Sequence, residues 1–391
     1  MSNIRTDCRI CHGIRLELIL KLTPTPIGDQ FLLEPEEQPL HPIDLYQCQD
    51  CGLAQLLYEI QPEEIYKDYL YLTGSSKGLD DHFAQYARRV ATICNLNSED
   101  VVCDIGSNDG TLLKHFKNLG MRVYGIEPSA HIAKIARANG IPTQEGYFKK
   151  GMGFGKANLI TANNVVANIA DLDAFMDGVV DLLASDGNFV FESFYLGDVV
   201  RNMVFDFIYH EHLSAFSVKP VKALIRRYGL AVYHVEHLNT KGGSIRYFCN
   251  RYYAGKHREV EDDDDAIYEA QTYIDFAKRI ESERERTLAF LREAKSQAKT
   301  IAGFGASISC TTLLYHFGAG GYISYLIDDN PAKQGRLSPG LHLPVYPTSE
   351  LYKRYPDYVV ALAWRFAEDF RADHPQFDLI APLPEFRCIR A

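Results

Sequence analysis

Apolar positions between residues 76 and 194 alternate between two patterns. Short apolar runs such as "DVVCDIG" and "MRVYGIEP" predict buried strands, whereas "TLLKHFKNLG" and "HIAKIARANG" have apolar residues at helical spacing. Strands that alternate with helices in this way are typical of a parallel sheet with crossover helices. We therefore expect a doubly wound, Rossmann-like α/β domain over residues 75–255.

A different pattern follows residue 256. The acidic run "EVEDDDD" leads into a long amphipathic stretch that ends near residue 298. Apolar residues at spacings of three and four predict a helix packed on one side, and they are Ile267, Ala270, Ile274, Ala277 and Ile280. We expect the acidic run at the start of this helix, where the helix dipole favours negative charge.

The last part of the chain predicts a second, smaller α/β unit. "KTIAGFGASISCTTLLYHFG" gives a strand, a glycine turn and a helix, and the strands "YISYLI" and "YVVALA" follow. The expected organisation is a small zinc-binding domain at 1–74, the sheet domain at 75–255, a connecting helix at 256–298 and a smaller Rossmann-like α/β domain at 299–391.

Length and charge narrow the class of protein. A chain of 391 residues that is 46% apolar is long enough for two or three cores. Its net charge of -10 and the lack of a dense Lys/Arg stripe argue against nucleic acid or an anionic membrane as partner. The first residues contain no apolar signal core, so we expect a cytoplasmic protein. We further expect a monomer that acts on a small molecule.

Four of the nine cysteines form two close pairs. "CRIC" holds Cys8 and Cys11, and "CQDC" follows after 36 intervening residues with Cys48 and Cys51. Two such knuckles together complete a tetrahedral four-thiolate site for structural Zn²⁺. The Pro-rich stretch between them has too few helical repeats for a core of its own, so the metal would supply folding energy. The alternative, a redox pair, lacks the strand and helix context it needs.

A glycine turn in the sheet domain indicates a cofactor site. "VVCDIGSNDGTLLKHF" places Asp104, Gly106 and Asn108 between a strand and a helix, where backbone amides face a ligand. Glu127 lies 21 residues past Gly106 at the end of the next strand, where an acid binds ribose hydroxyls. This spacing suits NAD and S-adenosylmethionine alike. Asp104 favours S-adenosylmethionine, because a carboxylate attracts a methionine amino group and repels a pyrophosphate.

"ITANNVV" ends another strand at Asn163 and Asn164, on the side of the sheet where adenine and the reacting group are expected. Ordinary turn residues are the alternative for both asparagines.

"DFIYHEHLSAFS", residues 206–217, packs Tyr209, His210, Glu211 and His212 among apolar neighbours. These side chains are suited to metal binding, to proton transfer, or to a hydrogen-bonded place in a core. The cluster by itself does not decide among the three.

The order of motifs along nearly the whole chain resembles one family. It runs through the two CxxC knuckles, "YKDYLYLTGSS", "DIGSNDGTLL", "GIEPS", "NNVVANIADL", "YHEHLSAFS", "KGGSIRYF", "GFGAS" and "DNPAKQGRLSPGLHLPV". This order looks like that of the nucleotide-linked sugar 3-C-methyltransferases, which make branched deoxysugars.

The resemblance implies a substrate and a set of roles. The substrate would be a nucleotide-diphosphate 4-keto-6-deoxy sugar, bound between the central and C-terminal domains. His212 would remove the C3 proton with Glu211 beside it and Tyr209 near the sugar. Tyr69 and Tyr71 match an aromatic pair that enters the active site, Tyr69 toward the cofactor and Tyr71 toward the substrate. The chain departs from the family at Asn168, where histidine is usual, and at Arg365, where asparagine is commoner.

Methylation at carbon requires a base and a hydrogen-bond donor. A carbanion forms most readily beside a ketone, so one well-placed base is required, and histidine with a pKa near ~6.5 is suited to it. The enolate then needs a donor, for which Tyr209, Lys241 or Arg246 is available. Lys241, Ser244 and Arg246 in "KGGSIR" are expected to contact the substrate, with a plain glycine-supported hairpin as the alternative.

"GFGAS" is expected to receive the diphosphate, with charge from Lys333 and Arg336. NAD is a competing ligand because Asp328 lies 25 residues past Gly303, but Ile308 stands where a third glycine is needed. A purely structural cap is the other alternative.

Three functions remain open from the sequence. The first is a C-methyltransferase acting on a nucleotide-linked 4-ketohexose. The others are an O-methyltransferase on a nucleotide-sugar hydroxyl and a non-catalytic zinc-ribbon scaffold that binds a nucleotide.

Overall fold

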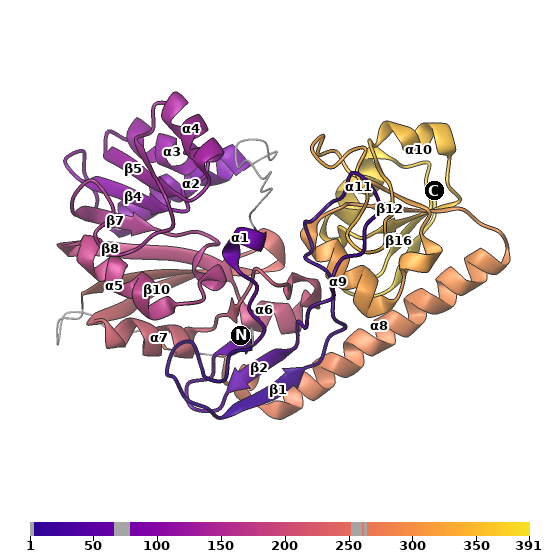
Figure 1. Ribbon diagram of the computed structural model, residues 1–391, viewed down its shortest axis with the longest axis horizontal. Helices are drawn as coiled ribbons and strands as arrows, with labels where there is room; N and C mark the ends of the chain where they lie inside the picture. The colour runs from indigo at the N-terminus through magenta and orange to yellow at the C-terminus, as the bar shows by residue number, and fades with distance from the viewer. Residues whose placement is uncertain (1–3, 66–78, 252–259, 262–263) are drawn as a thin grey trace.

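The chain folds into two α/β lobes joined by a small N-terminal sheet and one long helix (Figure 1). This computed structural model describes residues 4–65, 79–251, 260–261 and 264–391. Within these ranges no helix combines the length and the apolar character that a membrane span needs.

The N-terminal sheet is antiparallel and has the order β1-β2-β3-β9. Its elements, with the short helix that follows, are β1 (Leu16–Leu20), β2 (Leu45–Cys48), β3 (Ala54–Leu56), β9 (Ser214–Ala215) and α1 (Pro62–Ile65). Strand β9 comes from the middle of the chain and pairs Ala215 with Ala54 and Ser214 with Gln55. The segment that directly follows His212 is therefore a strand of the N-terminal sheet.

The central lobe holds a seven-stranded sheet of order β10-β11-β8-β7-β4-β5-β6. Its elements are α2 (Leu79–Ile93), β4 (Val101–Ile105), α3 (Thr111–Asn118), β5 (Arg122–Glu127), α4 (Ala130–Ala138), β6 (Thr143–Glu145), β7 (Ala157–Thr161), α5 (Leu172–Leu182), β8 (Leu183–Phe194), α6 (Leu196–Arg201), α7 (Val218–Arg227), β10 (Leu230–Leu238) and β11 (Ser244–Arg251). Strands β4 to β8 are parallel, and β11 and β10 add an antiparallel edge.

Successive residues of the central strands face opposite sides of this sheet, as the strand repeat of two requires. Val102 and Leu159 pack with helices α2 and α3, whereas their neighbours Cys103 and Ile160 belong to the larger core on the other face. Both faces are thus covered, which explains why these strands read as continuous apolar runs. The predicted doubly wound fold is confirmed.

The C-terminal lobe has a six-stranded sheet of order β14-β13-β12-β15-β16-β17, parallel except for β17. Its elements are β12 (Ile301–Phe304), α9 (Ile308–Phe317), β13 (Tyr325–Ile327), β14 (Val345–Tyr346), α10 (Ser349–Arg354), β15 (Tyr358–Ala361), α11 (Ala367–Asp373), β16 (Leu379–Ala381) and β17 (Arg387–Ile389). The second Rossmann-like unit expected from the sequence is present.

Helix α8 (Ala270–Ser296) connects the lobes, but two details predicted for it were wrong. Its buried stripe contains Tyr273, Phe276 and Ile280, while Ile274 is 49% exposed. Large aromatic side chains bury more apolar area, so they and not the isoleucine set the contact face. The acidic run does not start the helix, since Asp264 lies ahead of it and accepts a hydrogen bond from Arg201 Nη1 at 2.6 Å.

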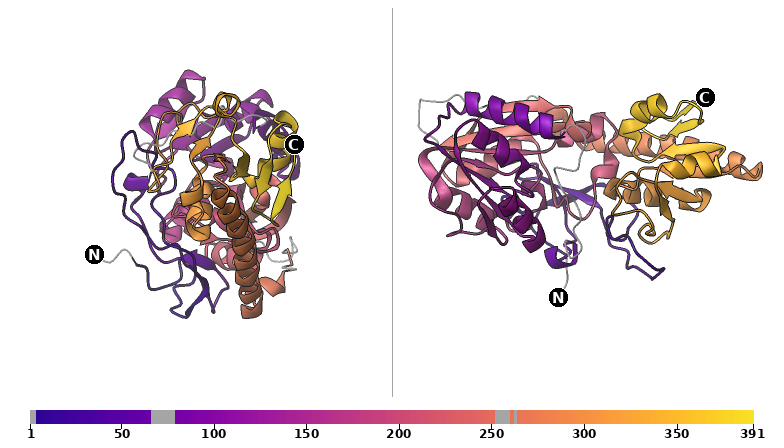
Figure 2. Two further views of the ribbon diagram at one scale, coloured as in Figure 1. Left: turned by 90° about the vertical axis from the view of Figure 1, so that its right-hand side faces the viewer. Right: turned by 90° about the horizontal axis from the view of Figure 1, so that it is seen from above.

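The Pro-rich stretch between the cysteine pairs leaves the N-terminal sheet and lies along the C-terminal lobe (Figure 2). Leu32 forms a β-bridge with Leu337, and Thr311 Oγ1 donates to the carbonyl of Gly28 at 3.0 Å. The stretch is therefore a connection between the first and last parts of the chain. The domain limits given above stay a prediction.

Candidate active site and metal centre

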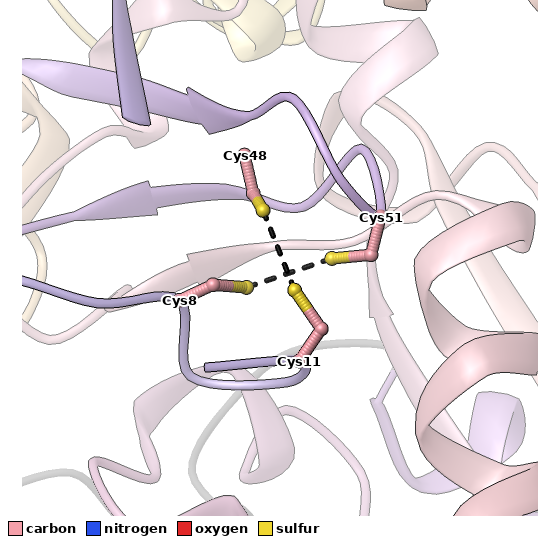
Figure 3. A group of neighbouring side chains, drawn as sticks. All are labelled: Cys8, Cys11, Cys48 and Cys51. Carbon is pink, nitrogen blue, oxygen red and sulfur yellow. Dashed lines mark hydrogen bonds between the residues drawn. The ribbon is translucent and has the colours of Figure 1, made fainter. Parts of the chain in front are cut away.

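The four paired cysteines meet at one point (Figure 3). Their Sγ atoms all lie within 4.8 Å of one another, with Cys8 to Cys51 and Cys11 to Cys48 both at 3.5 Å. Zn–S bonds of about 2.3 Å in a tetrahedron place sulfur atoms about 3.8 Å apart, so the arrangement fits four-thiolate zinc. The predicted ligand set is thus brought together.

Backbone turns support this cluster. The amide of Ile10 donates to Cys8 Sγ at 3.4 Å, and the amide of Gly52 donates to the carbonyl of Cys48 at 2.8 Å. Gly52 has φ +84°, and an added Cβ would lie 2.8 Å from the Tyr268 ring, so the second knuckle requires glycine. The hydrogen bond between Cys8 and Cys51 lowers the pKa of Cys8 and raises that of Cys51, as expected of two thiols that share a proton.

The predicted cofactor residues gather at the carboxyl ends of β4 and β5. Glu127 is 5% exposed, and its two carboxylate oxygens accept the amides of Asn108 at 3.0 Å and Ser129 at 2.9 Å. Burial raises the pKa of Glu127, although both amides oppose this shift. The acid is therefore fixed in place beside the glycine turn, where a ribose is expected.

Asp104 lies next to this acid on β4. Its Oδ1 accepts the hydroxyl of Thr161 at 2.6 Å, and burial, followed by the charge of Glu127, raises the pKa of Asp104 to about 7. Gly106 has φ +70°, and a Cβ there would lie 2.5 Å from a methyl of Val165. A positively charged group placed at Asp104 would restore its ionised form.

Asn163 and Asn164 follow β7 at the same edge of the sheet. Asn163 Oδ1 accepts the hydroxyl of Tyr86 at 3.0 Å, whereas its Nδ2 is buried with no hydrogen-bond partner among the described residues. Asn164 has φ +56°, and its amide donates to the carbonyl of Glu192 at 2.8 Å. Asn164 is thus a turn residue, and Asn163 retains a donor for a ligand. Two buried acids and this donor fit S-adenosylmethionine.

His212 lies beside the carboxyl end of β8. Its ring stacks on Phe194 with centroids 4.5 Å apart and on Tyr209 with centroids 4.1 Å apart. Its Nδ1 is 2.7 Å from the carbonyl oxygen of Phe207. A carbonyl only accepts, so Nδ1 carries the hydrogen and Nε2 is the basic atom of the neutral ring.

Comparisons with known proteins agree with this geometry. Three family models match in succession, described as "Putative zinc binding domain" over residues 8–66, "Methyltransferase domain" over 80–235 and "C-methyltransferase C-terminal domain" over 239–383. The chain is also 30% identical to C-methyltransferase NovU of Streptomyces niveus, over 98% of this chain and 97% of that protein. The chain belongs to the C-methyltransferases. It is an S-adenosylmethionine-dependent enzyme with a zinc-binding domain.

Solved structures match one part of this C-methyltransferase. The PH0226 protein of Pyrococcus horikoshii matches with a TM-score of 0.40 and 12% identity, over 48% of this chain and 99% of its own. Magnesium protoporphyrin IX methyltransferase of Synechocystis matches with a TM-score of 0.37 and 14% identity, over 49% of this chain and 97% of its own.

Several residues that the sequence assigned to substrate have protein partners in the C-methyltransferase. Arg246 is 3% exposed, and its guanidinium pairs with Glu192 at 2.9 Å and Glu236 at 3.0 Å. Ser244 Oγ donates to the carbonyl of Thr240 at 3.1 Å, at the end of the β10–β11 hairpin. Their contact with substrate stays a prediction. Tyr69, Tyr71 and the side chain of Lys241 lie outside the described residues.

The two cations expected at a diphosphate are held by the Pro-rich stretch. Lys333 Nζ is 2.5 Å from Asp29 Oδ1 and donates to the carbonyl of Ala306 at 2.9 Å. Arg336 Nη1 donates to the carbonyl of Phe31 at 3.3 Å. Both side chains therefore join the first part of the chain to the last, and their role toward a diphosphate stays a prediction.

His210 contacts the N-terminal part of the chain. It is 2% exposed, its Nε2 donates to the carbonyl of His41 at 3.3 Å, and burial lowers the pKa of His210 to about 4. Asn168 ends the 3-10 turn Val166–Asn168, and its amide donates to the carbonyl of Val165 at 2.9 Å.

Two residues that support the cofactor edge were missed in the sequence. Tyr86 orients the amide of Asn163 and lies 4.1 Å from the guanidinium of Arg246. Thr161 donates to Asp104. Tyr86 stands on a helix far from the glycine turn, so no local pattern marks it. Thr161 could have been found more easily, because its hydroxyl ends the apolar run "ANLIT" at the carboxyl edge of the sheet.

Proposed function

We propose that this C-methyltransferase methylates C3 of a nucleotide-linked 4-keto-6-deoxyhexose through an enolate. The observation that carries the proposal is the hydrogen bond between His212 Nδ1 and the carbonyl of Phe207, at 2.7 Å. It assigns the hydrogen to Nδ1 and leaves Nε2 as the basic atom, as a proton-abstracting histidine requires.

The rings around His212 support this role. Phe194 and Tyr209 stack on the imidazole and restrict its rotation. Tyr209 is 8% exposed, so charge interactions beside it are weakly screened by water. Glu211, half-buried next to His212 in the chain, is the proposed electrostatic partner of the imidazolium.

The proposed reaction has two steps. His212 Nε2 takes the proton from C3, and the electron pair of the C–H bond enters an enolate whose charge rests on the C4 oxygen. Tyr209 donates a hydrogen bond to this oxygen. Bound S-adenosylmethionine would supply the methyl group that the enolate carbon takes, with the electrons of the broken bond left on sulfur, and the imidazolium of His212 loses its proton to water.

S-adenosylmethionine supplies an electrophilic methyl group when it is bound. Asp104 and Glu127 are the residues proposed to hold its amino group and its ribose, and Asn163 Nδ2 is the donor proposed to face it. Gly106 and Asn108 belong to the turn that would approach it. The monomeric state and the cytoplasmic location expected from the sequence stay predictions.

Hydrogen exchange in heavy water tests the proposal. The enzyme is incubated with a panel of 4-keto-6-deoxyhexoses linked to thymidine or guanosine diphosphate, without S-adenosylmethionine, and C3 deuterium is measured by mass spectrometry. We expect exchange at C3 with at least one sugar, and a mass gain of one methyl group when the cofactor is added. Methylation without C3 exchange would instead favour transfer to a hydroxyl.

His212→Ala separates catalysis from binding. We expect it to lower C3 exchange by about 10²- to 10⁴-fold while S-adenosylmethionine binding, followed by calorimetry, is retained. Retained turnover would contradict the role of His212 and would be the result expected of a different base.

A further inference from the structure

The C-terminal lobe makes a buried ionic contact with the segment that precedes His212. Asp206, in the 3-10 turn Phe205–Phe207, is 0% exposed. Its Oδ2 accepts the indole N–H of Trp364 at 3.1 Å, and Arg365 Nη1 lies 3.2 Å from Oδ1 and 3.1 Å from Oδ2. A buried carboxylate is thus paired and hydrogen-bonded by two residues that lie 158 and 159 positions away in the chain.

Arg365 also covers the next residue of this turn. Its guanidinium carbon lies 4.3 Å from the centroid of the Phe207 ring, and its Nη2 donates to Ser309 Oγ at 3.4 Å. The guanidinium therefore contacts Asp206 through Nη1 and also lies over the ring of Phe207. Arginine is suited to both contacts at once, and lysine, a compact point charge, is not.

Phe207 is in turn hydrogen-bonded to His212. Its carbonyl accepts the Nδ1 hydrogen of the imidazole at 2.7 Å. The following residue is held as well, because Thr312 Oγ1 donates to the carbonyl of Ile208 at 3.1 Å from helix α9. The peptide of the accepting carbonyl is therefore held in two ways: within the turn, where the amide of Ile208 donates to the carbonyl of Phe205 at 3.0 Å, and from the C-terminal lobe.

We propose that Arg365 and Asp206 are positioning residues that fix the Phe207 carbonyl, and through it the proton on His212 Nδ1 and the direction of Nε2. The inference rests on the proposed role of His212 as base. It makes the C-terminal lobe a part of the proton-transfer site in addition to any substrate contact. A carbonyl displaced from Nδ1 no longer selects one tautomer. In a fraction of the molecules Nε2 then carries the hydrogen and cannot accept the C3 proton.

The test uses the full chain and two readouts. The tautomer of His212 is measured by NMR of protein labelled with ¹⁵N-histidine, with His212→Ala identifying its signals. Exchange at C3 in heavy water is measured on the same proteins. The variants are Arg365→Gln, Asp206→Asn and their combination, and Arg387→Gln is the matched control because its ion pair with Glu368 lies on the surface of the same lobe.

We expect a defined Nδ1–H tautomer in the wild type and in Arg387→Gln. In Arg365→Gln the tautomers should mix and C3 exchange should slow by about 10²-fold, the cost of a small misplacement of a catalytic group. The KM for S-adenosylmethionine should stay unchanged. Because both residues act through one carbonyl, the combined variant should lose no more exchange than Arg365→Gln alone.

Wild-type tautomer and wild-type exchange in Arg365→Gln would overturn the inference. A tautomer that depends on Arg365 in a protein that never exchanges C3 would support the inference and contradict the proposed function. If Arg365→Gln does not fold, Arg365→Lys takes its place, since it keeps the charge and loses the flat contact with Phe207. Wild-type tautomer and exchange in the lysine variant would then reject the positioning role.

Discussion

The four-cysteine cluster and the segment 206–212 are both dense groups of polar side chains, but they are built in opposite ways. The cluster consists of two short turns, each of which carries both of its ligands within four residues. In the 206–212 segment the contact of His212 with the carbonyl of Phe207 is local, but other partners come from far away in the chain: His41 holds His210, and Arg365 and Trp364 hold Asp206. The spacing of the cysteines therefore predicts the metal site, whereas contacts with distant residues determine the surroundings of His210 and Asp206 in the 206–212 segment.

Loss of the metal should have the largest effect. In Cys48→Ser/Cys51→Ser the N-terminal sheet should unfold, because structural zinc sites contribute about 10–16 kcal/mol in isolated zinc-finger peptides. Strand β9 belongs to that sheet, so activity should fall with it. Zinc content and thermal unfolding are the measurements. Cys388→Ser, a single cysteine of β17, is the control that should change neither. A double variant that keeps zinc and its melting temperature would contradict the assignment.

His212→Ala should lower catalysis at the 206–212 segment and leave the zinc cluster intact. We expect C3 exchange to fall by about 10²- to 10⁴-fold, the range for a lost general base, with zinc content and melting temperature close to wild type. His210→Gln is the matched change within the same motif, because its amide can still donate to the carbonyl of His41. It should retain exchange within a few-fold. Equal losses in both variants would show that the motif acts only as packing.

Acid should destabilise the protein through His210. Burial lowers the pKa of His210 to about 4 from the ordinary value of 6.5, so the unfolded chain binds a proton first as the pH falls. The resulting decrease in the free energy of unfolding is absent above pH 6.5 and reaches about 3 kcal/mol near pH 4. Urea unfolding of His210→Gln between these values should show a shallower decline. The exposed His131→Gln should follow the wild type, and parallel curves for all three would reject the prediction.

Asp104→Asn should weaken S-adenosylmethionine binding by about tenfold, the equivalent of one charged hydrogen bond. The pKa of Asp104 is about 7, and only its ionised form attracts an amino group, so wild-type affinity should rise as the pH increases through 7. Calorimetry at pH values on either side of 7 measures this rise. The asparagine variant should show a flat profile, and a flat profile in the wild type would refute the contact.

The sequence predicted the parts of the site that repeat a local pattern. The glycine turn, Asp104 and Glu127 lie at adjoining strand ends because parallel strands all end at one edge of a sheet. The ion pairs of Arg246 could not be predicted in this way. Its place in "KGGSIR" predicted a contact with substrate, and the motif did not indicate that the hairpin directs it into the sheet between Glu192 and Glu236. Strand alternation decides which face a residue occupies, and the pairing register sets that alternation.

Side chains on helices were predicted less well for a related reason. Helix α8 has apolar residues on more than one face, and its orientation depends on what lies beneath it. Tyr273 and Phe276 became the buried residues, and Ile274 did not. A period of three and four residues identifies a helix, but only packing selects among its faces.

By itself the sequence determined the zinc ligands, the two α/β sheets and the cofactor edge, because each depends on contacts between residues close in the chain or on the regular order of strands. Only the tertiary structure decided that His210 contacts His41, that the Pro-rich stretch reaches the C-terminal lobe, and that Asp206 contacts Arg365. Burial removes water as a partner for these polar groups, so each must find one elsewhere in the fold, and no local spacing specifies where.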